Sequence, residues 1–224
     1  MKNKFIFICI LVPFSLLFKS CDKSNDGGLL DFNYNFYPLE INQVREYHVT
    51  DISHNSLGSD TVLYFLKEII SEEFLDEEGD ISYRVERFWK TDSISEYSIK
   101  DVWTSKITAR TAQKVEENIR YTKLIFPISR GGFWNGNGFN YLEEQEYYYD
   151  SINGSSTFGV NSFDSTLYVI HNLKANILEF EEAYEVYAKH IGLVYKKDVE
   201  LNINMGDVLD INQGHEYEQL LMNY

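Results

Sequence analysis

Val44-Arg45-Glu46-Tyr47-His48-Val49-Thr50-Asp51-Ile52 alternates between apolar and polar side chains, and a second apolar run, Thr61-Val62-Leu63-Tyr64-Phe65-Leu66-Lys67-Glu68-Ile69-Ile70, follows nine residues later. Alternation with period two is typical of a strand that buries one face, and β-branched and aromatic residues favour strands. The two stretches therefore predict two consecutive β-strands.

The rest of the chain repeats this pattern of apolar runs separated by turns. Asp76-Glu77-Glu78-Gly79-Asp80 has the composition of a turn, and Ile81, Tyr83 and Val85 after it share one face of a strand. Further strands are expected at 96–108, 112–126, 141–152, 163–172, 193–203 and 215–223. This spacing predicts an all-β fold: an antiparallel meander that forms a lipocalin-like barrel or half-barrel.

One segment fits two patterns. Phe180, Ala183, Tyr184, Tyr187, Ala188 and Ile191 recur at helical spacing, and Gly192 follows where a helix would end. The same stretch also alternates through Leu178, Phe180, Tyr184 and Val186. We expect at most one short helix, near 180–191.

The N-terminal residues have the order of a secretory signal peptide. Lys2 and Lys4 precede an apolar run over 5–18, which is too short to cross a bilayer as a helix. Lys19-Ser20-Cys21 follows, so the break resembles a bacterial lipoprotein signal in which Cys21 is lipidated, for example with palmitate. The alternative is cleavage to a soluble protein with a free thiol.

Three segments follow from this assignment: a signal peptide over 1–20, a lipidated N-terminus with a flexible tether over 21–36, and a single β domain over 37–224. The tether is inferred from the polar, glycine-containing sequence after Cys21. We expect an exported protein that is lipid-anchored to the bacterial envelope, at the outer membrane, with the membrane as its partner through the anchor.

The charge balance restricts the partners. The chain carries 20 basic and 35 acidic side chains, and residues 1–20 hold three lysines and no acid, so the remainder has a formal net charge of −18. An acidic surface disfavours nucleic acid, because phosphates repel it. We expect no nucleic-acid partner.

The residues that usually carry chemistry are scattered. The five histidines have no short metal-ligand spacing, and only one cysteine remains after the signal peptide. The acidic turn 76–80 lacks the alternating aspartates of an EF-hand, so a hairpin turn is preferred to a calcium site. The sequence predicts no metal, no cofactor, no catalytic residue and no enzyme.

The stretch 130–141 is the best candidate for a ligand site. It combines four glycines with Trp134, Asn135, Asn137, Phe139 and Tyr141. Aromatic rings stack on sugar faces and amides bind hydroxyls, so this set predicts a site for a small molecule or glycan. The alternative is a wide strand connection whose Trp134 plugs one end of the barrel.

A modification pattern recurs four times. Asp followed by Ser or Thr and then a small apolar residue or Thr resembles the acceptor used for O-glycosylation in exported Bacteroidetes proteins. The acceptor positions are Thr61, Ser93, Ser151 and Ser165.

Several short motifs also resemble a family of exported Bacteroidetes lipoproteins without an assigned activity. They are Tyr37-Pro38-Leu39-Glu40 with Glu46-Tyr47-His48-Val49, Tyr83–Arg87, Lys114–Asn118, Trp134–Asn137, and Tyr187-Ala188-Lys189 with Gly192–Lys196. The family motif that begins with the match at Tyr37-Pro38-Leu39 usually continues with Gly-Asn-x-Trp. Residues 42–45 replace that part in this chain. The resemblance implies an exported all-β domain of lipocalin-like shape and no catalytic residue.

Two functions remain open. The first is a cell-envelope lipoprotein that binds a small apolar ligand or a glycan, since a closed eight-stranded barrel can hold one small ligand. The second is a structural or interaction protein of the envelope, with a solidly packed barrel and no ligand. A cavity of several hundred Å³ would favour binding.

Overall fold

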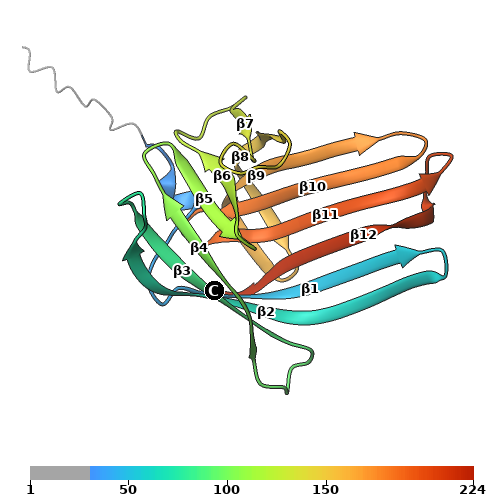
Figure 1. The fold of residues 1–224 in the computed structure, drawn as a ribbon, viewed down its shortest axis with the longest axis horizontal. Coiled ribbons are helices and arrows are strands. Elements are labelled where there is room, and N and C mark those ends of the chain that lie inside the picture. The colour runs from blue at the N-terminus through green and yellow to red at the C-terminus, as the bar shows by residue number, and fades with distance from the viewer. Residues whose placement is uncertain (1–30) are drawn as a thin grey trace, which may run out of the picture. The chain divides into compact units, whose positions relative to one another are not determined.

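The computed structural model describes residues 31–224, which form one twelve-stranded antiparallel sheet (Figure 1). The strands are β1 (Val44–Asn55), β2 (Gly58–Leu75), β3 (Ile81–Lys90), β4 (Ser98–Ile107), β5 (Thr111–Glu116), β6 (Ile119–Ile125), β7 (Phe133–Asn135), β8 (Glu146–Phe158), β9 (Asn161–Ala175), β10 (Glu179–Ala188), β11 (Gly192–Asn204) and β12 (Asp207–Asn223). The only helix in this part of the chain is the single 3₁₀ turn η1 (Tyr34–Phe36). The predicted all-β meander is confirmed.

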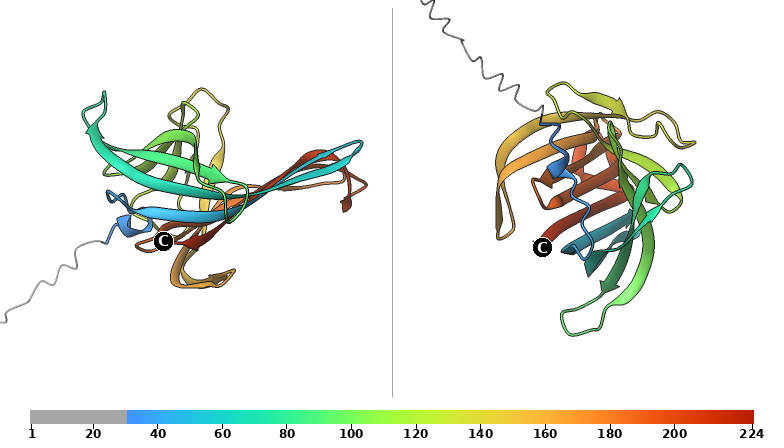
Figure 2. Two further views of the ribbon diagram at one scale, coloured as in Figure 1. Left: turned by 90° about the horizontal axis from the view of Figure 1, so that it is seen from below. Right: turned by 90° about the vertical axis from the view of Figure 1, so that its left-hand side faces the viewer.

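The first and last strands meet in the middle of the sheet. Its order is β6-β5-β4-β3-β2-β1-β12-β11-β10-β9-β8-β7, so β1 pairs with both β2 and β12. The two edge strands, β6 and β7, are therefore consecutive in the chain. The sheet curls until these edges approach each other, as the end-on view in Figure 2 shows.

The edges are joined by individual bonds in place of a strand ladder. The Thr122 amide donates to the Gly136 carbonyl (2.9 Å), and Trp134 Nε1 donates to the Thr122 carbonyl (2.8 Å). The Tyr149 hydroxyl donates to the Ile125 carbonyl (2.7 Å) and accepts from the Ile125 amide (2.9 Å). We call this line of contacts the seam, and it makes the barrel nearly closed.

Six strands continue beyond the curled part as a projecting sheet (Figures 1 and 2). Pairing with β3 begins at Phe65, so Gly58–Tyr64 of β2 extends past it. Pairing with β8 ends at Ile170, so the last residues of β9 also extend past their neighbour. We call the outer ends of β1, β2 and β9–β12 the extension.

The segment 180–191 is not a helix, because Glu179–Ala188 forms strand β10. Its pairing skips His171 on β9 and Val194 on β11, so the extra residues lie on the neighbouring strands and β10 keeps its alternation. Both faces of β10 are covered: Tyr187 belongs to one core cluster, whereas Val186 and Ala188 belong to another. The helical spacing arises because apolar residues lie on both faces of this strand.

The expected strand over 112–126 is a hairpin made by β5 and β6. Its turn residues Glu117 and Asn118 both have positive φ, of 49° and 64°. This is the backbone of a tight two-residue hairpin turn, which usually contains glycine. Residues 117 and 118 are Glu and Asn, so no glycine marks the turn and the two strands looked continuous.

The packed domain also begins before Tyr37. Phe36 is fully buried and Phe32 packs against the same core, so 31–36 packs with the domain and does not form part of the expected tether. The Asn35 carbonyl accepts from the His190 amide (2.7 Å). The expected signal peptide and Cys21 lie outside the described residues. No helix within residues 31–224 is long and apolar enough to cross a membrane.

The barrel interior combines an apolar core with buried ions. The core includes Phe36, Leu124, Trp134, Tyr149 and Tyr187. Beside it, the Glu68 carboxylate is 2 % exposed and lies 3.1 Å from Arg87 Nε, 3.4 Å from Lys114 Nζ and 4.0 Å from Arg45 Nη2. Buried charges are tolerated only when they are paired, so this cluster fixes three strands around one carboxylate.

Glu68→Gln should destabilise the domain by about 3–5 kcal/mol, because it leaves three buried cations without their shared carboxylate. The free energy of unfolding in urea measures this loss. Glu77→Gln is the matched control, since Glu77 is exposed on the β2–β3 turn and should change stability by no more than about 0.5 kcal/mol. Equal effects of the two variants would contradict the role of the cluster.

The same variant has a pH signature. Burial alone would raise the pKa of Glu68, but its cationic neighbours, Lys114 first, outweigh burial and hold that pKa at about 2. The folded pKa is below the ordinary 4.5, so Glu68 stabilises the fold above pH 4.5, and this stabilisation is lost as the pH falls toward 2. The unfolding free energy should decline less over this window in Glu68→Gln than in the wild type.

Candidate ligand-binding cavity

A cavity of about 330 Å³ lies beside the seam. Its wall comes from both ends of the sheet and from the loop between β7 and β8. The lining residues are Glu116, Tyr121 and Lys123 from β5 and β6; Asn137, Leu142 and Gln145 from the loop; Tyr147, His171, Asn172 and Ala183 from β8–β10; and Lys196, Asp198, Val199 and Glu200 from β11. The curl of the sheet brings residues some 80 positions apart to one place.

Two stacked rings form one wall of the cavity. Tyr147 and His171 lie 3.9 Å apart between ring centroids with planes 9° apart, and Trp134 meets Tyr147 edge-on at 6.0 Å. Burial lowers the pKa of the His171 imidazole to about 3 despite the attraction of Glu185, so this ring is neutral at pH 7. The wall is therefore aromatic, uncharged and rigid.

A buried ion cluster supports the same wall. Lys123 Nζ lies 2.9 Å from Glu185 and 3.0 Å from Glu116, and Glu185 also accepts from the Tyr187 hydroxyl. Burial opposes the charged forms, but this pairing raises the pKa of Lys123 and lowers the pKa of Glu185. Both groups stay charged at neutral pH. They form an ion pair with each other, so neither is free to bind a ligand.

Several other polar groups of the lining have neither a hydrogen bond nor an ion pair within the described residues, although the Lys196 ammonium lies over the Tyr217 ring, 5.5 Å from its centroid. Within residues 31–224, the hydroxyls of Tyr121 and Tyr147 make no hydrogen bond, and Lys196, Asp198 and Glu200 have no oppositely charged group within 4 Å. Hydroxyls donate and accept, ammonium groups donate and carboxylates accept. The cavity can therefore hold a molecule rich in hydroxyl or amine groups.

The residues predicted for a ligand site separate into four groups. Trp134 is 8 % exposed and packs on Tyr149, so it is a core residue that closes the seam. The Asn135 side chain accepts from the backbone amides of Asn137 and Gln145, which shapes the loop. Of the predicted set, Asn137 alone lines the cavity.

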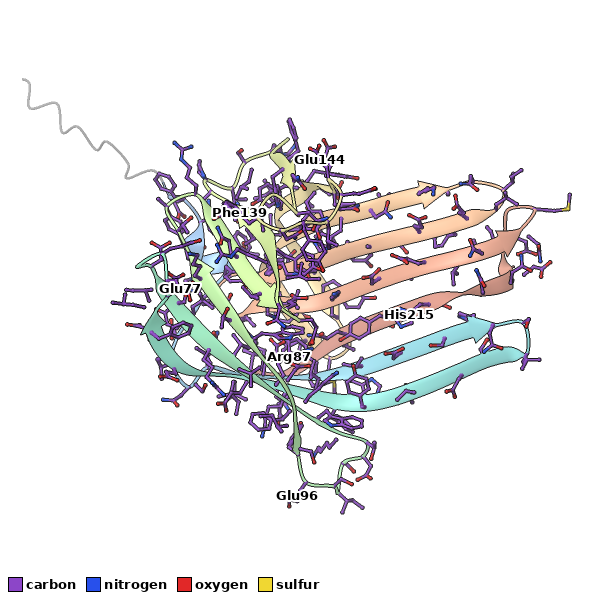
Figure 3. All side chains as sticks on the ribbon, viewed as in Figure 1. Glu77, Arg87, Glu96, Phe139, Glu144 and His215 are labelled. Atoms are coloured by element: carbon purple, nitrogen blue, oxygen red, sulfur yellow. The ribbon has the colours of Figure 1, made fainter. Side chains whose placement is uncertain are left out.

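Phe139 and Tyr141 point away from the fold. Their side chains are 55 % and 82 % exposed, and Figure 3 shows Phe139 on the loop above the barrel. The tyrosines that line the cavity are Tyr121 and Tyr147 instead. The run Tyr147-Tyr148-Tyr149 was a usable cue for Tyr147, because alternate tyrosines of a strand share a face, and 147 and 149 are both buried.

The predicted O-glycosylation acceptors differ in access. Thr61 on β2 and Ser93 on the β3–β4 loop are exposed. Ser151 and Ser165 are half-buried, and the Ser165 hydroxyl donates to Asn153 Oδ1 (2.9 Å). Thr61 and Ser93 are thus the two exposed acceptors of the four.

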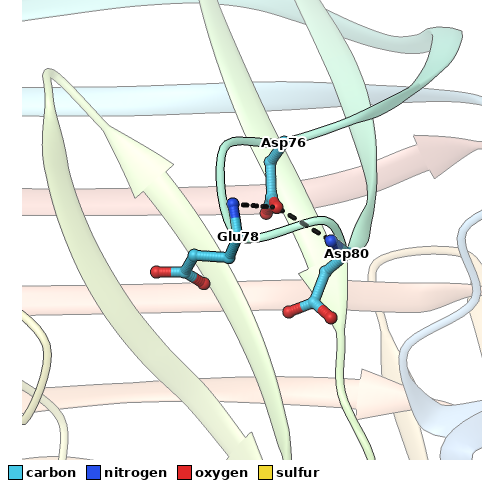
Figure 4. A group of neighbouring side chains, drawn as sticks. All are labelled: Asp76, Glu78 and Asp80. Atoms are coloured by element: carbon cyan, nitrogen blue, oxygen red, sulfur yellow. Dashed lines mark hydrogen bonds between the residues drawn. The ribbon is translucent and has the colours of Figure 1, made fainter.

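The acidic turn holds a lysine where a metal ion would lie. Asp76, Glu78 and Asp80 bring their carboxylates together (Figure 4), and Lys106 Nζ lies 2.8 Å from Asp76, 3.0 Å from Asp80 and in contact with Glu78. Arg120 also pairs with Glu78 (2.7 Å). The turn is an internal ion cluster that ties β2–β3 to β4 and β6.

The fold and cavity thus define an all-β, nearly closed barrel with a polar cavity at its seam. No protein-family model and no curated protein sequence matches the chain. Among solved structures, a Bacteroides fragilis protein described as exported with a YmcC-like fold is similar at 10 % identity and a TM-score of 0.43, over 83 % of this chain and 96 % of that one.

A second similar structure is a Vibrio parahaemolyticus domain described as an outer-membrane lipoprotein-sorting domain. The identity is 14 % and the TM-score 0.23, over 85 % of this chain and 87 % of that domain. Similarity at these levels transfers no function, so the cavity itself must carry the functional argument.

Gly136→Ala should disturb the cavity wall. A Cβ at Gly136 would overlap the Tyr147 ring, and ring Cε1 would be 2.8 Å away. Overpacking of this kind costs about 1–3 kcal/mol, measured as the free energy of unfolding. Gly138→Ala is the control on the same loop, where the new Cβ would meet the Asn135 carbonyl oxygen at 3.3 Å. Equal losses would show that Gly136 does not hold the ring in place.

Proposed function

We propose that this chain is an exported envelope lipoprotein, anchored through Cys21, whose barrel binds a small hydroxylated ligand of glycan type. The observation that carries the binding proposal is the cavity of about 330 Å³, which has an aromatic wall and hydroxyls without protein partners. Cavities for small molecules span about 300–1,000 Å³ and combine apolar walls with a few directed polar groups. We propose binding and no reaction at this site.

The chemistry of the lining favours a polar ligand over an apolar one. Besides Tyr147, the wall carries the Tyr121 hydroxyl and the charged groups of Lys196, Asp198 and Glu200, whereas the amides of Gln145 and Asn172 already donate to His171 and Glu181. An apolar molecule would strip water from these groups without replacing their hydrogen bonds, which is costly. A sugar offers C–H faces to the rings and hydroxyls to the polar groups.

The anchor has its own test. Wild type should incorporate labelled palmitate in the native host and Cys21→Ala should not, because Cys21 is the only cysteine beyond the predicted signal peptide. Unlabelled wild type would overturn the anchor and leave the cavity proposal untouched. The intact mass of the same samples reports any O-glycosylation at Thr61 or Ser93.

The ligand has a separate test. Native mass spectrometry of the domain purified from its own envelope should show a retained hydroxylated molecule, and Tyr147→Phe should weaken its binding about five-fold. This factor corresponds to one hydrogen bond of about 1 kcal/mol. Tyr141→Phe is the matched control, because Tyr141 is 82 % exposed and does not line the cavity.

The alternative is an envelope protein that works as a packed scaffold. The buried clusters around Glu68 and Glu185 favour it, since they fill much of the barrel interior with paired charges. A domain that carries no molecule, and whose tyrosine variants behave alike, would support the scaffold.

A further inference from the structure

We propose that the cavity is the closed end of a longer groove, and that the ligand is a linear oligosaccharide of amino sugars whose chain continues along the extension. This inference rests on the proposed glycan binding and specifies the length and charge of the ligand. Three observations carry it: a second hollow, the register of β10–β12, and the unpaired charges between the two hollows.

The second hollow adjoins the first. Its volume is about 380 Å³, and Glu200 lines both. The other side chains that line it include Glu181, Asn202, Gln213 and His215, on the outer ends of β10, β11 and β12. Figure 3 shows His215 on the extension, away from the curled part. The two hollows thus form one path from the seam onto the extension.

The strand register places the lining of this path on one face. Glu181, Glu200 and His215 are direct partners across β10, β11 and β12. Asp198 lies two residues before Glu200 on β11 and Asn202 two residues after it, so all three share that face. The distance along the strand from Asp198 to Asn202 is roughly 13 Å, which exceeds the length of one sugar ring.

The charges along the path favour an amine-bearing chain. Asp198 and Glu200 have no cation within 4 Å among the described residues, whereas Glu181 is paired with Lys174 (3.1 Å) and His215 with Asp51 (2.9 Å). Among residues 31–224, Lys196 in the first cavity is the one lining lysine without a carboxylate within 4 Å. Two free carboxylates against one ammonium attract ammonium groups and repel carboxylates on a ligand.

Free polar groups continue where the path leaves the barrel. The amides of Asn202 and Gln213 make no hydrogen bond within residues 31–224 and face the second hollow. Amides bind sugar hydroxyls as donor and acceptor at once. The oligosaccharide would therefore be bound by ring stacking on Tyr147, by the charge of Glu200 and by the side-chain amides of Asn202 and Gln213.

The test uses glucosamine oligomers of one to six units, their N-acetylated forms and oligogalacturonate, titrated calorimetrically into the whole mature domain at low salt. We expect the affinity for the glucosamine series to rise at least ten-fold between one and four units. The N-acetylated series should bind more weakly, and oligogalacturonate should not bind.

Variants locate the groove. Glu200→Gln should weaken binding of the glucosamine tetramer at least five-fold, and Asn202→Ala with Gln213→Ala should weaken the tetramer and leave the monomer unchanged. Glu182→Gln is the control, because it removes the same charge from the opposite face of the same strands, where Glu182 pairs with Lys197. Thermal unfolding verifies that all variants fold.

Three results would overturn the inference. Equal affinity for the glucosamine monomer and tetramer would contradict binding along the groove and leave the cavity proposal intact. Binding of oligogalacturonate as tight as that of the glucosamine tetramer would remove the charge preference. A lack of binding by every glucosamine oligomer would also overturn it, and the molecule retained in native mass spectrometry then decides whether glycan binding itself survives.

Discussion

The pairing of β1 with β12 is the constraint on which the other features depend. It uses the first and last strands of the domain as the centre of the sheet, so the chain has to run outward on both sides, through β2–β6 and through β11–β7. The two edges of the curled sheet then belong to strands that are neighbours in sequence. The contacts between these edges form the seam, and Trp134 and Gly136 lie where the barrel closes.

A polar interior follows from this curl. Strands β1, β2, β3, β5, β6 and β10 contribute charged residues to the interior, and the nearly closed barrel removes them from water, so they have to be paired. Glu68 with its three cations and Glu185 with Lys123 meet this need on two sides of the interior. Where pairing is complete the interior is filled, and where it is incomplete, near Lys196 and Asp198, the cavity remains. The candidate site is thus the part of the interior where charged side chains have no oppositely charged partner.

Much of the fold could be predicted from period-two patterning, and the exceptions have physical causes. The strands at 44–52 and 61–70 and the turn at 76–80 follow their local sequence. The helical spacing over 180–191 comes from apolar residues on both faces of β10, because each face is covered by a different core cluster, and the Glu117-Asn118 turn uses positive φ without glycine. The candidate site could not be predicted in the same way, because Tyr147, His171 and Lys196 come together only when the sheet curls. Alternation in the sequence also cannot distinguish a charged inner face from a solvated one.

The central meeting of the first and last strands makes the domain a circular permutant of a simple meander. Read from β7 through β12 and on through β1 to β6, every strand pairs with the next one along the sheet. All of these contacts are local except those between β1 and β12, such as His54 with Gly214, which join residues 160 positions apart. Pairings of high sequence separation form slowly, so the two halves can each assemble as local hairpins before that single closure unites them.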